Sequence, residues 1–254
     1  MTPIADPIFY VLAVPAVFLV GMSKGGFGGS IALLGVPMMS LVISPVQAAG
    51  IMLPILVCMD IVGLIAYRGK CDKTSLKILL PGAVVGIAIG YFTAAFVTEA
   101  HVRLIVGLVA LLFSLNYYLG RANRGEARPH KPWRGRFWGM VAGFTSFVSH
   151  TGGPPFQMYM LPLRLNPVLF AGTAIIFFST VNAIKLVPYF LLGQFDATNL
   201  ATSAVLLPVA PVATLFGVWL VHYVKAETFY RITYAMVLAI SFKLIWDGLG
   251  AFLA

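Results

Sequence analysis

Charged side chains are scarce in this chain of 254 residues. They make up 10% of it, where an average soluble domain carries roughly 25%. Hydrophobic residues make up 60% and gather in long runs. A soluble globular domain is therefore excluded, and the composition predicts an integral membrane protein with many helical spans.

Cysteine is also rare. Cys58 lies in an apolar run and Cys71 in a basic loop, so the sequence supports neither a disulfide framework nor a cysteine metal site. The sequence has no cluster of histidine, cysteine and carboxylate residues, and no nucleophile with a nearby base. We therefore expect no metal, no cofactor and no enzyme activity. No basic region precedes the first apolar run, so we expect no cleavable signal peptide.

Basic residues outnumber acidic ones and give a net charge of +9. They sit mainly in loops between apolar runs, where they orient a membrane protein, so we expect no nucleic-acid partner. The apolar runs fall at about 8–22, 29–43, 46–67, 76–97, 102–120, 137–149, 152–163, 168–192, 199–222 and 229–253. A straight span needs about 20 residues. The pairs 8–22/29–43 and 137–149/152–163 are shorter, and each is one broken span, a re-entrant hairpin or two thin spans.

A glycine-rich motif separates the first two runs: Ser23-Lys24-Gly25-Gly26-Phe27-Gly28-Gly29. A charge inside an apolar segment is costly, so it usually pairs, reaches water or meets a ligand. Glycines let helices start and stop sharply. A half-helix N-terminus beside a lysine would suit an anion.

An altered copy of this motif lies 126 residues further on, at Ser149-His150-Thr151-Gly152-Gly153-Pro154-Pro155. With gaps, other positions also correspond: Ser44-Pro45 with Asn166-Pro167, Asp60 with Asn182, Asp72 with Asp196, and Leu80-Pro81 with Leu207-Pro208. The sequence thus predicts two membrane repeats, 1–120 and 136–254, joined by a basic cytoplasmic linker, 121–135. Broken segments in both halves are typical of secondary transporters.

Loop charges predict the topology of the repeats. If each short pair is a hairpin or double span, thirteen basic residues lie inside and one, Arg103, lies outside; single spans give ten and four. The first arrangement obeys the positive-inside rule better. It inverts the two repeats, places both termini outside, and gives each repeat a broken or hairpin first segment followed by three transmembrane helices. The predicted fold class is thus an all-α integral membrane protein.

Several residues of the chain carry a resemblance to a known family. They are Leu34-Gly35-Val36-Pro37, Gly143-Phe144, Gly152-Gly153-Pro154-Pro155, Pro167, Ala171-Gly172-Thr173, Asn182, Lys185 and Gly193-x-x-Asp196. In this order, over nearly the whole chain, they resemble the TauE/SafE-like family of sulfite exporters. The resemblance implies export of small anions, mostly sulfur oxyanions or organosulfonates. The chain differs from the commoner glycine-rich pattern at Lys24 and His150, which leaves the anion open.

The predicted substrate-binding residues are Ser23, Lys24, Gly25, Gly26, Ser149, His150, Thr151, Gly152, Asn182 and Lys185. Alternatives stay open: lysines snorkel to the headgroups, and hydroxyls cap half-helices or join membrane helices. His150 binds the anion, carries a proton, or is a neutral hydrogen-bonded side chain. Asp60 pairs with a lysine or carries a coupling proton. Lys243 and Asp247 are expected to pair within the last helix.

The predicted function is a secondary transporter in the cytoplasmic (inner) membrane. It would export a small sulfur-containing anion, such as sulfite, thiosulfate or an organosulfonate, by alternating access at a site near the midplane. Protons are the candidate coupling ion, through Asp60 or His150. The alternatives are an anion channel and a non-transport membrane assembly protein, and a homo-oligomer is left open.

Overall fold

A computed structural model describes residues 3–29, 31–93, 96, 98–119, 127–191 and 196–253. Within these ranges the chain is helical and contains no strand. The helices of the first predicted repeat are α1 (Pro7–Gly26), η1 (Ile31–Leu34), α2 (Gly35–Met39), α3 (Pro45–Ala66), α4 (Lys73–Thr93) and α5 (Glu99–Tyr118). Those of the second are α6 (Pro132–Ser149), α7 (Gly153–Met160), η2 (Leu161–Leu163), α8 (Pro167–Leu191), α9 (Ala197–Leu206), α10 (Val209–Tyr223) and α11 (Ala226–Leu253). Residues 121–126 of the predicted linker and Gly193 of the predicted motif lie outside the described ranges.

Six described helices are long and apolar enough to cross a membrane: α1, α3, α4, α5, α8 and α11. The pair α9 and α10 passes the same test together, bent by 47°. The predicted all-α, multi-pass membrane fold is therefore confirmed. The single run predicted at 199–222 is instead broken at Leu207-Pro208, where proline supplies no N–H and crowds the preceding turn.

The first helix corrects the predicted position of the first break. α1 runs for 20 residues and includes Ser23, Lys24, Gly25 and Gly26, so the apolar segment is longer than the run 8–22 suggests. The break follows Gly26. After it, η1 and α2 together span only residues 31–39, too short to cross a hydrocarbon core about 30 Å thick. The opening pair is therefore one candidate span followed by a short helical segment.

The chain forms two compact units. Unit 1 comprises residues 1–71 and 171–223, and unit 2 comprises residues 72–170 and 224–254. The division passes through α8, so each unit contains helices of both predicted repeats. The repeat boundaries themselves stay a prediction.

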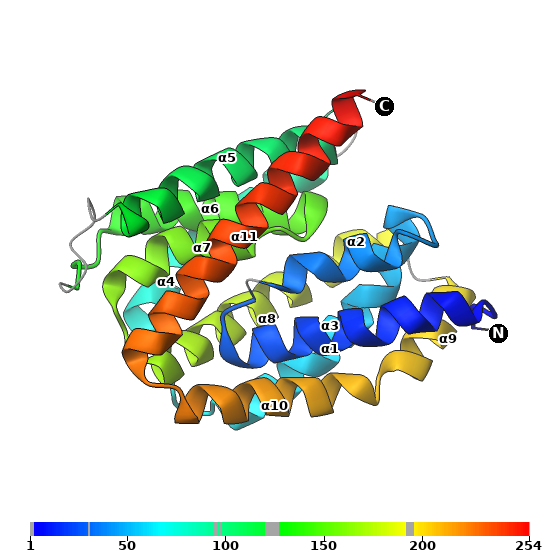
Figure 1. Ribbon diagram of the computed structural model, residues 1–254, viewed down its shortest axis with the longest axis horizontal. Coiled ribbons are helices and arrows are strands. Elements are labelled where there is room, and N and C mark those ends of the chain that lie inside the picture. Colours follow the sequence, from blue (N-terminus) through cyan, green and yellow to red (C-terminus); the bar gives the residue numbers. More distant parts are fainter. Residues whose placement is uncertain are drawn as a thin grey trace. The chain divides into compact units, whose positions relative to one another are not determined.

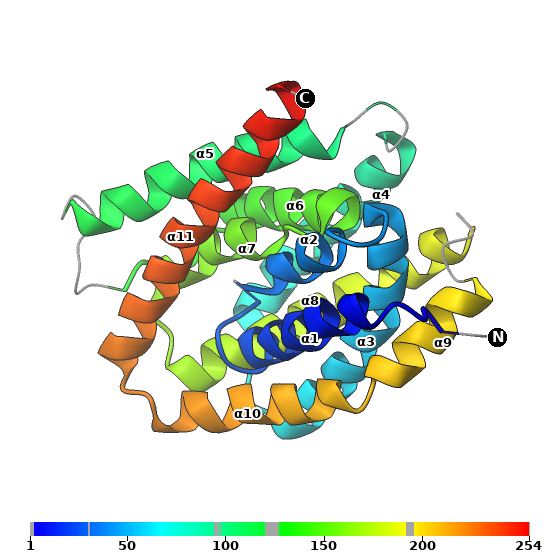
Figure 2. The same cartoon turned by 45° about the vertical axis from the view of Figure 1, so that its right-hand side comes forward.

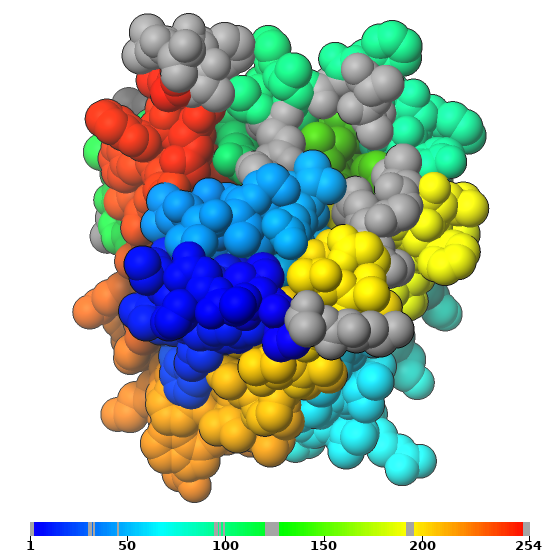
Figure 3. All heavy atoms as spheres, turned by 90° about the vertical axis from the view of Figure 1, so that its right-hand side faces the viewer, coloured from blue at the N-terminus to red at the C-terminus, as the bar shows by residue number. Residues whose placement is uncertain are grey.

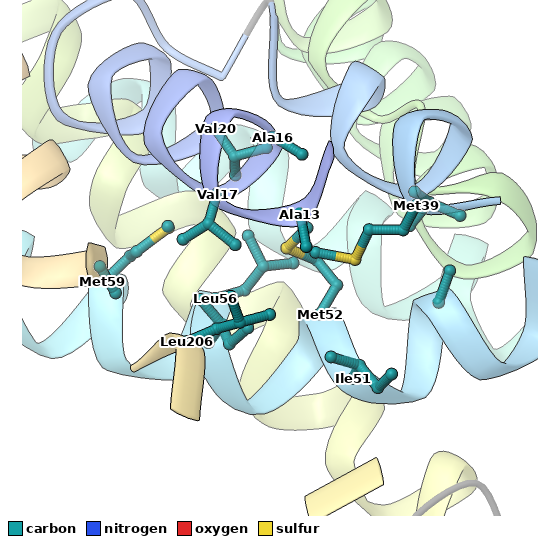
Figure 4. Packing of buried hydrophobic residues seen from close by; sticks show 14 of the residues in the cluster. Ala13, Ala16, Val17, Val20, Met39, Ile51, Met52, Leu56, Met59 and Leu206 are labelled. Carbon is teal, nitrogen blue, oxygen red and sulfur yellow. The ribbon is translucent and has the colours of Figure 1, made fainter. Parts of the chain in front are cut away.

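Unit 1 is organised around α1, which lies along α10 and also contacts α2 and α3. Figure 1 shows α1 and α10 side by side. Figure 3 shows the start of α1 at the surface, next to α2 and α9, and the Ile4 N–H donates to the Thr202 hydroxyl there. The core inside is apolar: in Figure 4, Ala13, Val17 and Val20 of α1 face Met52 and Leu56 of α3.

Unit 2 is built from two close helix pairs, α4 with α6 and α5 with α11. Figure 2 shows α6 beside α7, and α5 beside α11. Glycine permits the close approach of α4 and α6. A Cβ on Gly86 would lie 1.9 Å from the Met140 carbonyl oxygen, and one on Gly143 would lie 2.2 Å from that of Ala83. No hydrophobic effect drives membrane helices together in lipid, so they gain stability from van der Waals packing. Small residues at the interface allow that packing because they let the backbones approach closely.

We predict that Gly86→Ala destabilises the protein, because the new methyl group must push α4 away from the α6 backbone. Overpacking of this kind costs about 1–3 kcal/mol. The measurement is the thermal unfolding midpoint of the purified variant in detergent. Gly250→Ala is the matched control, since a Cβ there meets nothing within 4 Å. Equal midpoints for the two variants would contradict the packing role of Gly86.

Candidate functional site

The end of α1 places Lys24 in the interior of unit 1. The Ser23 carbonyl accepts hydrogen bonds from the N–H groups of Phe27, at 2.8 Å, and Gly29, at 3.1 Å. Gly28 and Gly29 have φ angles of 64° and 76°, which side chains with a Cβ rarely adopt. The glycine pair therefore ends the helix just after Lys24, which lies in its last turn.

Lys24 forms a buried ion pair. Its Nζ lies 2.5 Å from Asp60 Oδ1 and donates to the Leu56 carbonyl at 3.2 Å. Lys24 and Asp60 are each 4% exposed. The alternative in which Lys24 snorkels to the headgroups is therefore wrong, and of the two alternatives for Asp60 the pairing with a lysine is confirmed.

Two residues of α8 complete the group. Asn182 Nδ2 donates to the second Asp60 oxygen, Oδ2, at 2.7 Å. The Lys185 side chain is fully buried, which excludes snorkelling, and its Nζ lies 5.3 Å from the centre of the Tyr189 ring. Lys185 is repelled by Lys24 and attracted by Asp60. We call Lys24, Asp60, Asn182 and Lys185 the charge cluster.

The charge cluster has a formal excess of positive charge. Across the described residues, the buried charged side chains are Lys24, Asp60 and Lys185. Counted formally, two lysines against one aspartate leave one positive charge. The other carboxylates of unit 1, Asp6 and Asp196, are exposed and cap the N-termini of α1 and α9. They therefore serve helix ends rather than the cluster.

The predicted half-helix N-terminus beside Lys24 is wrong. Lys24 lies in the last turn of α1, and the C-terminal end of a helix carries partial negative charge. Positive potential at the cluster therefore comes from the lysine side chains. The neighbouring glycines have a packing role, because a Cβ on Gly25 would lie 2.1 Å from the Thr214 carbonyl oxygen of α10. Contacts of Ser23, Gly25 and Gly26 with substrate stay predictions.

Tyr67 holds this end of α1 against the end of α3. Its hydroxyl donates to the Gly25 carbonyl at 2.5 Å. Burial raises the pKa of the Tyr67 phenol, which keeps the hydroxyl protonated as a donor. The ring of His222, at the end of α10, stacks on the Tyr67 ring with centroids 6.3 Å apart. Lys24 is thus positioned by contacts from α3 and α10 as well as by its own helix.

The second motif lies in unit 2, at the turn between α6 and α7. Ser149 Oγ and Thr151 Oγ1 are 2.7 Å apart, and Ser149 Oγ also donates to the Thr145 carbonyl at 3.2 Å. The Thr151 N–H donates to the same carbonyl at 3.2 Å. These bonds fit the alternative in which the hydroxyls serve the turn. Binding by Ser149 and Thr151 stays a prediction.

His150 ends α6 in the left-handed region, with φ of 55°, and is partly buried. Gly152 precedes α7, whose first turn contains Pro154 and Pro155. Prolines lack an N–H, so this N-terminus has fewer donors than an ordinary helix start. Substrate or proton binding by His150 and substrate binding by Gly152 remain predictions.

Sequence reasoning did not find every neighbour of the charge cluster. The Leu56 carbonyl gave no signal, because any residue has one. Tyr189 could have been found, since it lies four residues after Lys185 on the same helix and so shares its face. The expected pair of Lys243 and Asp247 is confirmed, with Nζ 2.5 Å from Oδ1.

A helical membrane protein that buries two lysines and an aspartate within its spans has the features of a solute-transport protein, since such residues mark substrate and ion pathways. Comparison with known proteins then gives the family. The model of the family "Sulfite exporter TauE/SafE" matches residues 13–244, and the chain belongs to this family. The resemblance read from the sequence is confirmed, and the members of this family are membrane exporters rather than enzymes.

A curated relative agrees with the family assignment. The chain is similar to the "Probable sulfite/organosulfonate exporter TauE" of Cupriavidus necator, with 26% identity over 178 residues. The match covers 68% of this chain and 66% of that protein, slightly less than two thirds of its length. No solved structure matches the chain significantly.

We predict that Asp60→Asn destabilises the protein strongly, because it leaves the buried Lys24 without its carboxylate. Breaking a buried pair from one side costs about 3–5 kcal/mol. Thermal unfolding in detergent measures the loss, and Lys24→Met combined with Asp60→Asn should recover much of it. The control is Glu227→Gln, which breaks the exposed pair with Arg231 on α11 and should cost little. If Asp60→Asn behaved like the control, the ion pair would not be structurally important.

Proposed function

We propose that this protein is a secondary transporter that exports a small sulfur-containing anion, and that the charge cluster is its binding site. The observation that carries the proposal is the burial of two lysines against one aspartate. An anion between Lys24 and Lys185 would balance the formal positive charge of the cluster, and family membership supports an anion as the solute.

The charge of the cluster favours a monoanion. One bound negative charge makes the cluster with its ligand formally neutral, whereas a dianion leaves an excess of negative charge. An organosulfonate whose only ionised group is the sulfonate carries a single charge through the physiological pH range, and sulfite does so when singly protonated. The three sulfonate oxygens are acceptors, and the ammonium groups of Lys24 and Lys185 and the Asn182 amide are donors.

Asp60 gives the site a means of release. Its carboxylate engages Lys24 and Asn182, at 2.5 Å and 2.7 Å. An arriving anion must compete with Asp60 for both donors. Such competition lowers affinity, and a carrier needs a site that is strong enough to replace water and weak enough to let the substrate leave.

We further propose that the protein works by alternating access of two inverted repeats. The packing within the units supports the repeats. Asp60 hydrogen-bonds to Asn182, its own counterpart in the second half. By the sequence correspondence, α6 is the counterpart of α1, and α4 is the counterpart of α9 and α10. In the structure α1 packs on α10, and α6 packs on α4. Such reciprocal contacts are what a twofold relation produces, and inverted repeats of this kind bind substrate near the midplane.

We predict that Lys24→Gln and Lys185→Gln each weaken anion binding about 10- to 150-fold, the loss expected for one charged hydrogen bond of about 1.5–3 kcal/mol. The measurement is thermal stabilisation of the purified protein by sulfite, sulfoacetate, thiosulfate and sulfate, since a bound ligand raises stability by mass action. Lys243→Gln is the control, because Lys243 pairs with Asp247 in unit 2 and is 43% exposed. Unchanged anion stabilisation in both cluster variants would remove the charge cluster as the binding site.

Proton coupling, if it drives transport, is proposed to pass through Asp60 or His150. Protonation of Asp60 would free Lys24 for the substrate, which gives Asp60 a direct link between proton and anion. We predict that the variant of the coupling residue, Asp60→Asn or His150→Gln, loses the response of flux to an imposed proton gradient but keeps exchange of anion for anion.

Flux into proteoliposomes at several pH values, with and without the gradient, measures this response. If a gradient drives the wild type and both variants alike, neither residue is the coupling site. Unitary flux far above that of a carrier would instead indicate a channel.

A further inference from the structure

Unit 2 carries a basic pocket that the proposed transport site does not use. It has a volume of about 230 Å³ and lies where the chain before α6 meets the end of α7. The cations Arg128, Lys131 and Arg134 line it, against an apolar wall that includes Met158, Tyr159 and Leu163. A second hollow of about 320 Å³ shares Lys131 and Arg134 and is otherwise lined by Trp133, Phe137 and Trp138.

The walls of this pocket are fixed by specific contacts. The Arg128 N–H donates to the Pro162 carbonyl at 2.9 Å, which ties the segment before α6 to η2. The His130 ring lies 3.4 Å from the Tyr159 hydroxyl on one side and 3.5 Å from Asp72 on the other. Gly135 lets Tyr159 come close, since a Cβ there would lie 2.8 Å from the Tyr159 ring. The pocket is therefore a built feature of unit 2 rather than a gap beside a loop.

We propose that this pocket binds the phosphate of an anionic phospholipid. Three cations meet at one hollow, and the N-terminus of α6 adds partial positive charge. Arginine suits phosphate because its planar guanidinium donates two parallel hydrogen bonds. The described acid near the pocket, Asp72, faces His130 and caps α4 through Ser75, so its charge is already shared with other groups.

The aromatic residues indicate a lipid rather than a soluble phosphate. Trp133 is 71% exposed and Phe137 is 48% exposed, directly beside the cations. Exposed tryptophans next to lysine and arginine are typical of the level of the lipid headgroups. A soluble anion has no use for this apolar surface, whereas the acyl chains of a lipid would cover it. Basic pockets between membrane helices are known to hold anionic headgroups.

The test compares lipids and soluble anions on the purified protein in neutral detergent. Phosphatidylglycerol should raise the unfolding temperature of the wild type, while phosphatidylcholine and inorganic phosphate should not. The double variant Arg128→Gln/Lys131→Gln should bind phosphatidylglycerol about 30-fold more weakly, the loss expected for two cations at about 1 kcal/mol each. Both side chains are exposed, so the unfolding temperature without lipid should not change.

The matched control is Arg68→Gln/Lys73→Gln, which removes the same charge from exposed positions outside the pocket and should leave lipid binding nearly unchanged. Trp133→Ala provides a second variant that keeps the charge and should also weaken phosphatidylglycerol binding. Stabilisation by inorganic phosphate alone would make the pocket a soluble-anion site and overturn the proposal. Equal lipid affinity in the pocket variants and the control would also overturn it.

Discussion

The ion pair between Lys24 and Asp60 is the interaction on which the candidate site depends. A charge buried among apolar helices must be compensated. Here the compensating group is the carboxylate of Asp60, which lies 36 residues after Lys24 in the chain. The pair links α1 to α3, and Asn182 extends the link to α8. Lys185 adds a second buried lysine near the same carboxylate, so the interaction that links three helices also lies at the centre of the proposed anion site.

Close helix packing supplies the second constraint. Without water to drive apolar surfaces together, membrane helices gain stability from van der Waals contact, which requires backbones to approach closely. Glycine makes this possible at Gly25 in unit 1 and at Gly86 and Gly143 in unit 2, where a Cβ would come within about 2 Å of a facing carbonyl oxygen. The glycines of the first motif therefore position Lys24 by fixing α1 on α10, whether or not they meet a substrate.

Charge is distributed differently in the two proposed binding regions. The charge cluster is buried and combines two lysines with one aspartate, which suits the proposed solute that must bind and leave. The basic pocket at the start of α6 is exposed, lined by three cations and flanked by aromatic rings. Such a surface suits the lipid headgroups, which surround a membrane protein at all times.

The sequence by itself determined the class of the protein, the helical spans and the family. Low charge and long apolar runs leave few alternatives, because a bilayer admits only structures that satisfy their own backbone hydrogen bonds. The sequence also singled out Lys24, Asp60, Asn182 and Lys185, since polar residues are conspicuous in apolar runs. It placed the first break too early, because a lysine and two glycines within four residues resemble a helix end, and only the packing of α1 against α10 shows that they continue the helix. The pairing of Lys24 with Asp60 rather than with solvent, and the meeting of Asp60 with Asn182, were decided by the tertiary structure, because side chains on different helices have no fixed relation until the helices pack.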